Sequence, residues 1–220
     1  VHLERAGSIN NIFLGKKELI DSLPPKGLAI LNNDDARLRK IINNEKRQII
    51  SFGIKNKSEI YAKNIVDNGL NGFVFDLFIQ NKFIYKLKIK QPGVHLIPCI
   101  LASIAIGNYL QIVPEKIKKA LENFLLNDRL QIISKKNNLT IIDDTYNSSP
   151  SSLIGALTLL GKSTNYKIAI LGDMKELGKT TKRNHINVGK IAAKNADEII
   201  CLGQDAKDIY ISSKHNTNLK

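Results

Sequence analysis

The chain has few of the residues that mark small disulfide-bonded or zinc-binding proteins. It contains only two cysteines, Cys99 and Cys201, and no Cys-X-X-Cys pair or Cys/His cluster. Tryptophan is absent, methionine occurs once, and aromatic residues make up 6% of the chain. The longest apolar runs, such as Ile97–Ile106, fall far short of the roughly 20 residues that a membrane span needs. A disulfide scaffold, a zinc module and a membrane-inserted protein are therefore set aside.

Acidic residues are also scarce, with 20 Asp and Glu against 33 Lys and Arg, for a formal charge of +13. Basic surfaces attract phosphate backbones, so a non-catalytic nucleic-acid-binding module is one hypothesis. Against it, the lysines accompany many asparagines and isoleucines, as in a general composition drift, and the densest basic stretch, residues 37–63, is not interleaved with an aromatic platform. We expect no nucleic-acid partner and favour an anionic small substrate.

The length and composition allow one large domain or two modest ones with a real hydrophobic core, since 43% of the 220 residues are hydrophobic. Up to residue 127, hydrophobic spacing and turn residues predict helices and strands in mixed order. The expected helices cover 9–23 (after Ser8), 36–43, 96–109 and 114–125, and the expected strands cover 28–31, 48–52, 59–67, 72–79 and 82–89, with a hairpin turn at 80–81.

From residue 128 the pattern changes to strands that alternate with helices, which predicts βαβ units and a parallel sheet. The expected strands are 130–134, 140–144, 167–171 and 198–202, and the expected helices are 150–160, 183–194 and 204–209. In such sheets ligands bind beyond the carboxyl ends of the strands. Functional residues are therefore expected at 143–149, 172–178 and 203–205.

One segment imitates a phosphate-binding loop. Ala156–Ser163 ends in Gly-Lys-Ser and has Ala where such a loop begins with Gly. A true loop follows a strand and opens a helix, so that the helix N-terminus faces the phosphates. Here the segment closes a helix, with Gly161 where a C-cap glycine belongs, so we interpret it as a helix end.

Two strand-end segments concentrate polar side chains. Ile141–Pro150 places the Asp143-Asp144 pair between a strand and a helix, and the same pattern would also suit a capped turn. Leu171–Gly178 holds two glycines and two carboxylates, and His185 follows on the next helix. A single histidine on a helix is more often structural than functional. His95, after the Pro92-Gly93 turn, opens another helix.

Four blocks together resemble the Mur ligases of peptidoglycan synthesis, in the branch that adds D-alanyl-D-alanine. The resemblance spans nearly all 220 residues, and the last two blocks are the most specific to that branch. The blocks are His2–Ser8 with Gly15–Glu18, Pro92–His95, Asp143–Pro150, and Gly172–Gly178 with His185–Gly189.

The resemblance implies an α/β fold in two parts. Residues 1–127 would be a partial central ATP-binding domain whose phosphate loop is missing, and residues 128–220 a Rossmann-like C-terminal ligase domain that is incomplete at its end. On this reading the chain is a fragment of a longer protein. The fragment alone is expected to be inactive.

The resemblance further implies a cytoplasmic, monomeric ATP-dependent ligase that joins D-alanyl-D-alanine to UDP-N-acetylmuramoyl-tripeptide through an acyl phosphate. Such chemistry depends on positioning and on neutralising phosphate charge, for which Mg²⁺, or Mn²⁺, is the expected metal. The identity of the third residue of the tripeptide, diaminopimelate or lysine, stays open.

Site residues follow from the same resemblance. Two residues would be catalytic and metal-binding, namely His2 and Lys16, the latter as a carbamate. Four would contact ATP, with Asp144 at the ribose and Arg129 beside it: Asn32, His95, Arg129 and Asp144. Four would face the incoming amine: Tyr146, Asn147, Asp173 and His185.

Three positions depart from the family pattern. Leu96 and Cys99 stand where Asn is usual, and Asp128 stands where Gly is usual. The alternatives left open are another Mur-type ligase (amino-acid-adding or folylpolyglutamate-like), the nucleic-acid module, and a decayed remnant of the enzyme.

Overall fold

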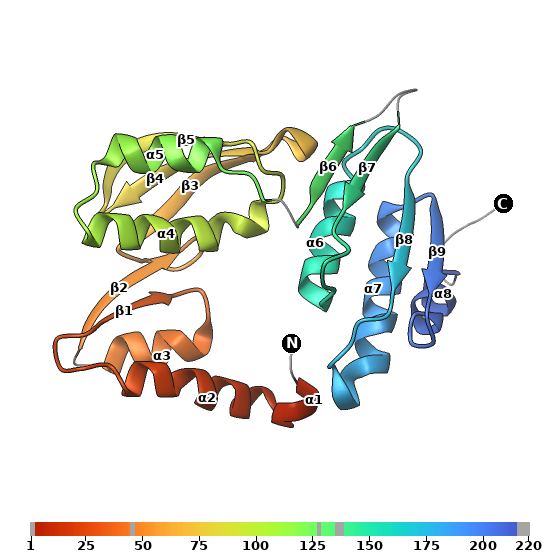
Figure 1. Cartoon of the computed structure of the whole chain (residues 1–220), viewed down its shortest axis with the longest axis horizontal. Coiled ribbons are helices and arrows are strands. Elements are labelled where there is room, and N and C mark those ends of the chain that lie inside the picture. Colours follow the sequence, from red (N-terminus) through yellow and green to blue (C-terminus); the bar gives the residue numbers. More distant parts are fainter. Residues whose placement is uncertain (1–2, 45–46, 127–128, 135–138, 215–220) are drawn as a thin grey trace. The chain divides into compact units, whose positions relative to one another are not determined.

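The computed structural model describes residues 3–44, 47–126, 129–134 and 139–214 (Figure 1). The chain divides into two compact units, Phe13–Leu125 and a second unit made of Val1–Ile12 with Leu126–Lys220. The division at residue 126 lies close to the domain boundary expected at 127/128. The grouping of the first twelve residues with the C-terminal part has no counterpart in the sequence pattern.

One mixed sheet forms the centre of the unit Phe13–Leu125, in the order β1-β2-β3-β4-β5. The first three strands pair in parallel and the last three pair in antiparallel fashion. Gln80 and Asn81 join the last two strands with φ angles of 48° and 64°, as a tight hairpin connection requires. The strands are β1 (Leu28–Asn32), β2 (Gln48–Gly53), β3 (Ile60–Asp67), β4 (Phe73–Ile79) and β5 (Lys82–Ile89).

The main core of this unit lies between the sheet and two helices, α4 (Ile97–Tyr109) and α5 (Pro114–Asn123). Phe73, Phe75 and Leu77 alternate along β4 and are fully buried, because successive strand residues point to opposite faces of the sheet. They pack in one cluster with residues of α4 such as Leu101. Pro114 is the first residue of α5, as the sequence predicted.

A smaller core joins α2 (Ile9–Asp21) and α3 (Ala36–Asn44) to β1, with Ile20, Leu31 and Ile41 buried together. The hydroxyl of Ser8 accepts a hydrogen bond from the Asn11 N–H at 3.0 Å, which confirms Ser8 as the N-cap of α2. The short helix α1 (Leu3–Ala6) was not predicted. Three 3₁₀ turns complete the description: η1 (Gly69–Asn71), η2 (Val94–Leu96) and η3 (Gly178–Thr180).

The C-terminal unit contains two separate strand pairs. β6 (Gln131–Ser134) and β7 (Thr140–Asp143) are antiparallel, whereas β8 (Ile168–Gly172) and β9 (Glu198–Leu202) are parallel and are joined through α7 (Thr181–Asn195). The expected βαβ unit is therefore β8–α7–β9. The first two strands form a hairpin instead of joining that sheet, because the link between them is too short for a crossover.

Three helices cover one face of the β8–β9 pair and share its core: α6 (Pro150–Leu160), α7 and α8 (Lys207–Lys214). The hydroxyl of Ser149 accepts from the Ser152 N–H and caps α6. Gly161 follows α6 as predicted, but its φ of −60° is right-handed. Its need for glycine comes from packing, since an added Cβ would collide with the side chain of Asn195 on α7.

The last helix starts later than the sequence predicted, at Lys207 rather than near residue 204. The Ala206 N–H bonds the carboxylate of Asp173, so the segment after β9 is held by the neighbouring loop before the helix begins. None of the helices in the described ranges is both long and apolar enough to cross a bilayer.

Candidate functional site

Four of the predicted site residues meet where β7 ends. The guanidinium of Arg129 donates to the backbone oxygen of Asn147 at 2.9 Å and lies 3.9 Å from a carboxylate oxygen of Asp144. It also lies 5.1 Å from the ring centroid of Tyr146, within the range of a cation–π contact. The same Asp144 oxygen accepts from the Leu130 N–H at 3.3 Å. We call Arg129, Asp144, Tyr146 and Asn147 the Asp144 cluster.

The local turn explains why this cluster is open to solvent. Asp143, the last residue of β7, accepts hydrogen bonds from the hydroxyl and N–H of Thr145 at 2.8 and 3.0 Å, which lower the pKa of the Asp143 carboxyl. This Asx-type turn carries the chain outward. The Tyr146 side chain is 73% exposed, so the cluster presents a carboxylate, a cation and an aromatic ring at one strand end.

At the strand end of β8 the polar groups link the loop to the segment that follows β9. One carboxylate oxygen of Asp173 accepts from the Ala206 N–H at 2.7 Å, and the other pairs with the ammonium of Lys175 at 2.7 Å. Lys175 also lies 3.7 Å from Asp205, just beyond β9. The Lys175 hydrogen bond is the largest cause that lowers the pKa of Asp173. Two of the three expected strand-end segments, 172–178 and 203–205, are thus brought together.

His185 lies beneath this loop and is completely buried. Its Nε2 accepts from the Met174 N–H at 3.0 Å, and its Nδ1 lies 2.8 Å from the carbonyl oxygen of Thr181, to which it donates. Both ring nitrogens are therefore engaged inside the unit. The geometry favours the structural reading of this histidine over direct contact with a substrate.

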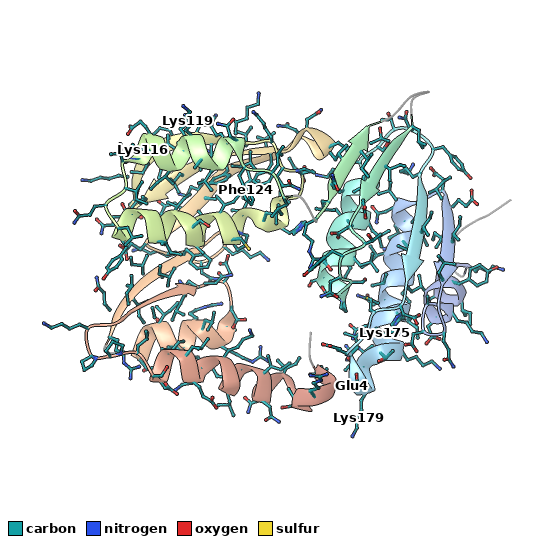
Figure 2. The ribbon with its side chains drawn as sticks, viewed as in Figure 1. Glu4, Lys116, Lys119, Phe124, Lys175 and Lys179 are labelled. Carbon is teal, nitrogen blue, oxygen red and sulfur yellow. The ribbon has the colours of Figure 1, made fainter. Side chains whose placement is uncertain are left out.

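The N-terminal segment also contacts this loop. The Glu4 N–H of α1 donates to the backbone oxygen of Glu176 at 3.2 Å, and an added Cβ at Gly178 would lie 3.0 Å from the Cα of Glu4. Glu4, Lys175 and Lys179 lie at the same end of this unit (Figure 2).

The remaining predicted residues belong to the unit Phe13–Leu125 or lie outside the described residues. Lys16 is exposed on α2, whereas its neighbour Lys17 is committed to an ion pair with Asp21 at 2.5 Å. Of these two lysines, Lys17 is thus the one whose amine pairs with Asp21. His2, the other predicted metal ligand, lies outside the described residues.

Asn32 and His95 also lie in this unit, on different elements. The side-chain oxygen of Asn32, at the end of β1, accepts from the Asp34 N–H at 2.9 Å. His95 is exposed in η2. Of the three departures from the family pattern, Leu96 is half-buried, Cys99 is exposed, and Asp128 lies outside the described residues.

Sequence reasoning missed Asp34, which organises the loop after β2. Its carboxylate accepts from the N–H groups of Ile54, Lys55 and Asn56 at 2.7, 3.0 and 2.9 Å. Burial would raise the pKa of Asp34, but these hydrogen bonds outweigh burial and leave that pKa below its ordinary value. The Asn-Asn-Asp-Asp run after β1 was the available signal.

Within the described ranges, no three Asp, Glu, His or Cys side chains gather into a group that could hold a metal ion. In that part of the chain, carboxylate, imidazole and thiol groups alone therefore do not make up a metal site.

Comparison with known proteins assigns the chain. Residues 1–107 match the family profile "Mur ligase middle domain", and residues 128–217 match "Mur ligase, glutamate ligase domain". The chain belongs to the Mur ligase family. The two matched ranges follow one another along the chain, in agreement with the two-part α/β fold that the sequence predicted.

The similar curated proteins include two that carry the same name, UDP-N-acetylmuramoyl-tripeptide–D-alanyl-D-alanine ligase. The one from Buchnera aphidicola subsp. Baizongia pistaciae is 36% identical over 97% of this chain and 46% of its own length. The one from Escherichia coli is 30% identical over 96% of this chain and 47% of its own length. This Mur ligase chain thus spans about half the length of the curated relatives it matches.

Among solved structures, MurF from Acinetobacter baumannii aligns with a TM-score of 0.87 and 27% identity, over 97% of this chain and 46% of that one. MurF ligase from Thermotoga maritima in complex with ADP aligns with a TM-score of 0.75 at 19% identity, which supports the fold alone.

Proposed function

We propose that the protein carrying this chain is an ATP-dependent amide ligase that adds D-alanyl-D-alanine to UDP-N-acetylmuramoyl-tripeptide in peptidoglycan precursor synthesis. The observation that carries the proposal is that relatives with this name match nearly the whole chain, through both domains. A nucleotide and a UDP-linked precursor as substrates place the reaction in the cytoplasm. We further propose that the protein acts as a monomer.

The chemistry requires an activated carboxylate. An oxygen of the tripeptide carboxylate attacks the γ-phosphorus of ATP, and ADP leaves with the bond electrons. The amine nitrogen of the dipeptide then attacks the acyl phosphate carbon, inorganic phosphate leaves, and the nitrogen loses a proton. Catalysis of both steps depends on orienting the reactants and on stabilising phosphate charge.

The Asp144 cluster has the donor set that a nucleotide needs. A carboxylate accepts hydrogen bonds from ribose hydroxyls, and a guanidinium pairs with phosphate oxygens in a fixed fork. Asp144 and Arg129 provide these groups 3.9 Å apart at a strand end, which supports their proposed contact with ATP. In the same proposal Asn32 and His95 contact the adenosine, and Tyr146, Asn147 and Asp173 meet the incoming amine.

We propose Lys16 as the lysine that carries a carbamate, on the family resemblance. Its amine is exposed on α2, where carbon dioxide can reach it. Carbamylation converts a cation into an anionic oxygen ligand. When bound, Mg²⁺ or Mn²⁺ would neutralise phosphate charge, with His2 and the carbamate as its proposed ligands.

The first test is a reconstituted ligation. The protein that carries this chain, and not the 220-residue chain alone, is incubated with ATP, Mg²⁺, D-alanyl-D-alanine and each tripeptide, containing diaminopimelate or lysine. The product is measured by mass spectrometry alongside phosphate release. Product is expected with one of the tripeptides only when ATP is present. Lys16→Ala should abolish product, added bicarbonate should not restore it, and Lys17→Ala should retain activity as the matched control.

A second candidate is another amino-acid-adding Mur ligase. It is favoured by a UDP-N-acetylmuramate–L-alanine ligase from Clostridium acetobutylicum that is 31% identical over 71% of this chain and 34% of its own length. Replacing the substrates by UDP-N-acetylmuramate and L-alanine in the same assay separates the two candidates, because only the correct pair should give product.

The basic stretch at 37–63 gives less support to nucleic-acid binding than its charge suggests. Arg39 and Arg47 donate to backbone oxygens of Asn33 and Ile20, inside the fold. Lys63 lies 5.3 Å from the ring centroid of Tyr61, and that ring stacks on Phe78. The Tyr61 ring is thus engaged by neighbouring groups and is not free to stack on a base.

A further inference from the structure

The loop after β8 has a backbone that needs external support. Glu176 has a φ of +62° and Gly178 a φ of +54°, both in the left-handed region. For a residue with a side chain this conformation persists only where the surrounding structure holds it. The residues that supply this support are therefore candidates for a role in the function of the loop.

His185 holds the same loop at Met174, two residues before Glu176, with a pair of bonds that few other residues could make. The Met174 N–H can only donate and the Thr181 carbonyl can only accept, so Nε2 is unprotonated and Nδ1 carries the hydrogen. One neutral tautomer bridges the loop to the first turn of α7. The ring is fully buried, and the side chain of Met174 is fully buried in the adjacent core.

The hydrogen bond from His185 acts next to the polar end of the loop. Met174 directly follows Asp173, whose carboxylate is fixed by Ala206 and Lys175. Anchoring the Met174 N–H therefore sets where the peptide group between Asp173 and Met174 lies. A small rotation there would move the Asp173 side chain away from Ala206.

We propose that His185 is a positioning residue, which sets the Gly172–Gly178 loop for the incoming amine without touching it. This inference rests on the proposed function, in which Asp173 meets that amine. It predicts an effect on the amine step that is separate from any general loss of stability.

The experiment compares three variants in the ligation assay. His185→Leu removes both hydrogen bonds, whereas His185→Gln can place an acceptor near the position of Nε2. Val188→Ala is the matched control, because Val188 is fully buried on the same helix and its truncation loosens the core without removing the bond to Met174. KM for D-alanyl-D-alanine, KM for ATP, kcat and thermal stability are measured for each protein.

His185→Leu should raise KM for D-alanyl-D-alanine by about tenfold, because the Met174 N–H beside Asp173 is then no longer held in place. KM for ATP should change by less than about twofold, and His185→Gln should recover most of the amine KM. Val188→Ala should lower stability and leave the amine KM unchanged. Exchange of the Met174 amide, followed by NMR, should be faster in His185→Leu than in His185→Gln.

Equal amine KM values in His185→Leu and Val188→Ala of similar stability would overturn the positioning role, since the effect would then be general. A rise in KM for ATP as large as that for the amine would overturn it too. If the wild-type protein makes no product with D-alanyl-D-alanine, the proposed function itself is overturned. The two failures are therefore distinguishable.

Discussion

The two strand-end loops of the C-terminal unit carry similar residues but use them differently. The Asp144 cluster leaves an aromatic ring 73% exposed beside a carboxylate and a guanidinium. In the loop after β8, the Asp173 carboxylate pairs with Lys175 and accepts from the Ala206 N–H, and the Met174 N–H donates to the buried His185. Carboxylates at strand ends therefore do not share one role. In the first loop an exposed aromatic ring lies beside the carboxylate, and in the second the carboxylate is bonded to the segment after β9.

The largest expected effect separates the two carboxylates of β7 and its turn. Asp144→Asn should lower kcat/KM for ATP in the ligation reaction by about a hundredfold, comparable to losing one charged contact in a preorganised site. Asp143→Asn is the control, because the hydrogen bonds to the Asp143 carboxylate among the described residues both come from Thr145 in its own turn. This variant should stay within about threefold of wild type. An equal fall in kcat/KM for ATP in both variants would show that Asp144 has no role that Asp143 lacks.

The second effect tests how tightly the other loop is held. Gly203 has a φ of +120°, and an added Cβ would collide with the Asp173 carboxylate, so Gly203→Ala should cost about 2 kcal/mol in the free energy of unfolding. Gly172→Ala is the matched control, since its nearest contact would be an ordinary 3.8 Å from the oxygen of Leu202. Urea unfolding of both variants measures the difference. If the two variants have equal free energies of unfolding, the Asp173 carboxylate can move aside and is not held firmly in the folded protein.

A smaller effect concerns the charge of Asp173. Asp173→Asn should lower the free energy of unfolding at neutral pH by about 1 kcal/mol through a weakened bond to Ala206 and a lost pair with Lys175. The folded pKa of Asp173 lies below its ordinary value, so this stability is present above about pH 4 and is lost as the pH falls through the folded pKa. Unfolding measured from pH 7 down to pH 3 should show the two proteins converge. If the difference in the free energy of unfolding between the two proteins stays constant over that range, the charge of Asp173 does not stabilise the loop.

The smallest expected effect is on the stability of the open loop. Tyr146→Ala should change the free energy of unfolding by less than about 0.5 kcal/mol, because an exposed cation–π contact contributes little. The same variant should still weaken use of the dipeptide in the ligation assay. A destabilisation above about 2 kcal/mol would mean that the ring supports the fold rather than a ligand.

Most elements were predictable because their signals are local. Alternating burial along β4, the Gln80-Asn81 hairpin and the Ser8 and Ser149 caps depend on neighbours in sequence. The roles within the site were less predictable. The burial of His185, the link from Asp173 to Ala206 and the late start of α8 depend on segments that meet only after folding.

Gly161 shows, at a single residue, that local features were predictable and contacts between distant segments were not. Its position at the end of α6 was foreseen from the helix pattern, yet its contact with Asn195 of α7 was not. The family resemblance implied that Arg129 lies beside Asp144, but it did not place Tyr146 and Asn147 against Arg129. No spacing rule would have placed Arg129, on the far side of a hairpin, against Asn147.

Amide exchange with and without ligands compares the two loops most directly. A nonhydrolysable ATP analogue and D-alanyl-D-alanine are added together, and exchange is followed by NMR at residues 144–147 and at Met174. Amides at 144–147 should slow by at least about tenfold as the exposed loop is covered, while Met174, already bonded to His185, should change little. Unchanged exchange at 144–147 with saturating ligands would contradict the proposal that the Asp144 cluster binds the nucleotide and the incoming amine.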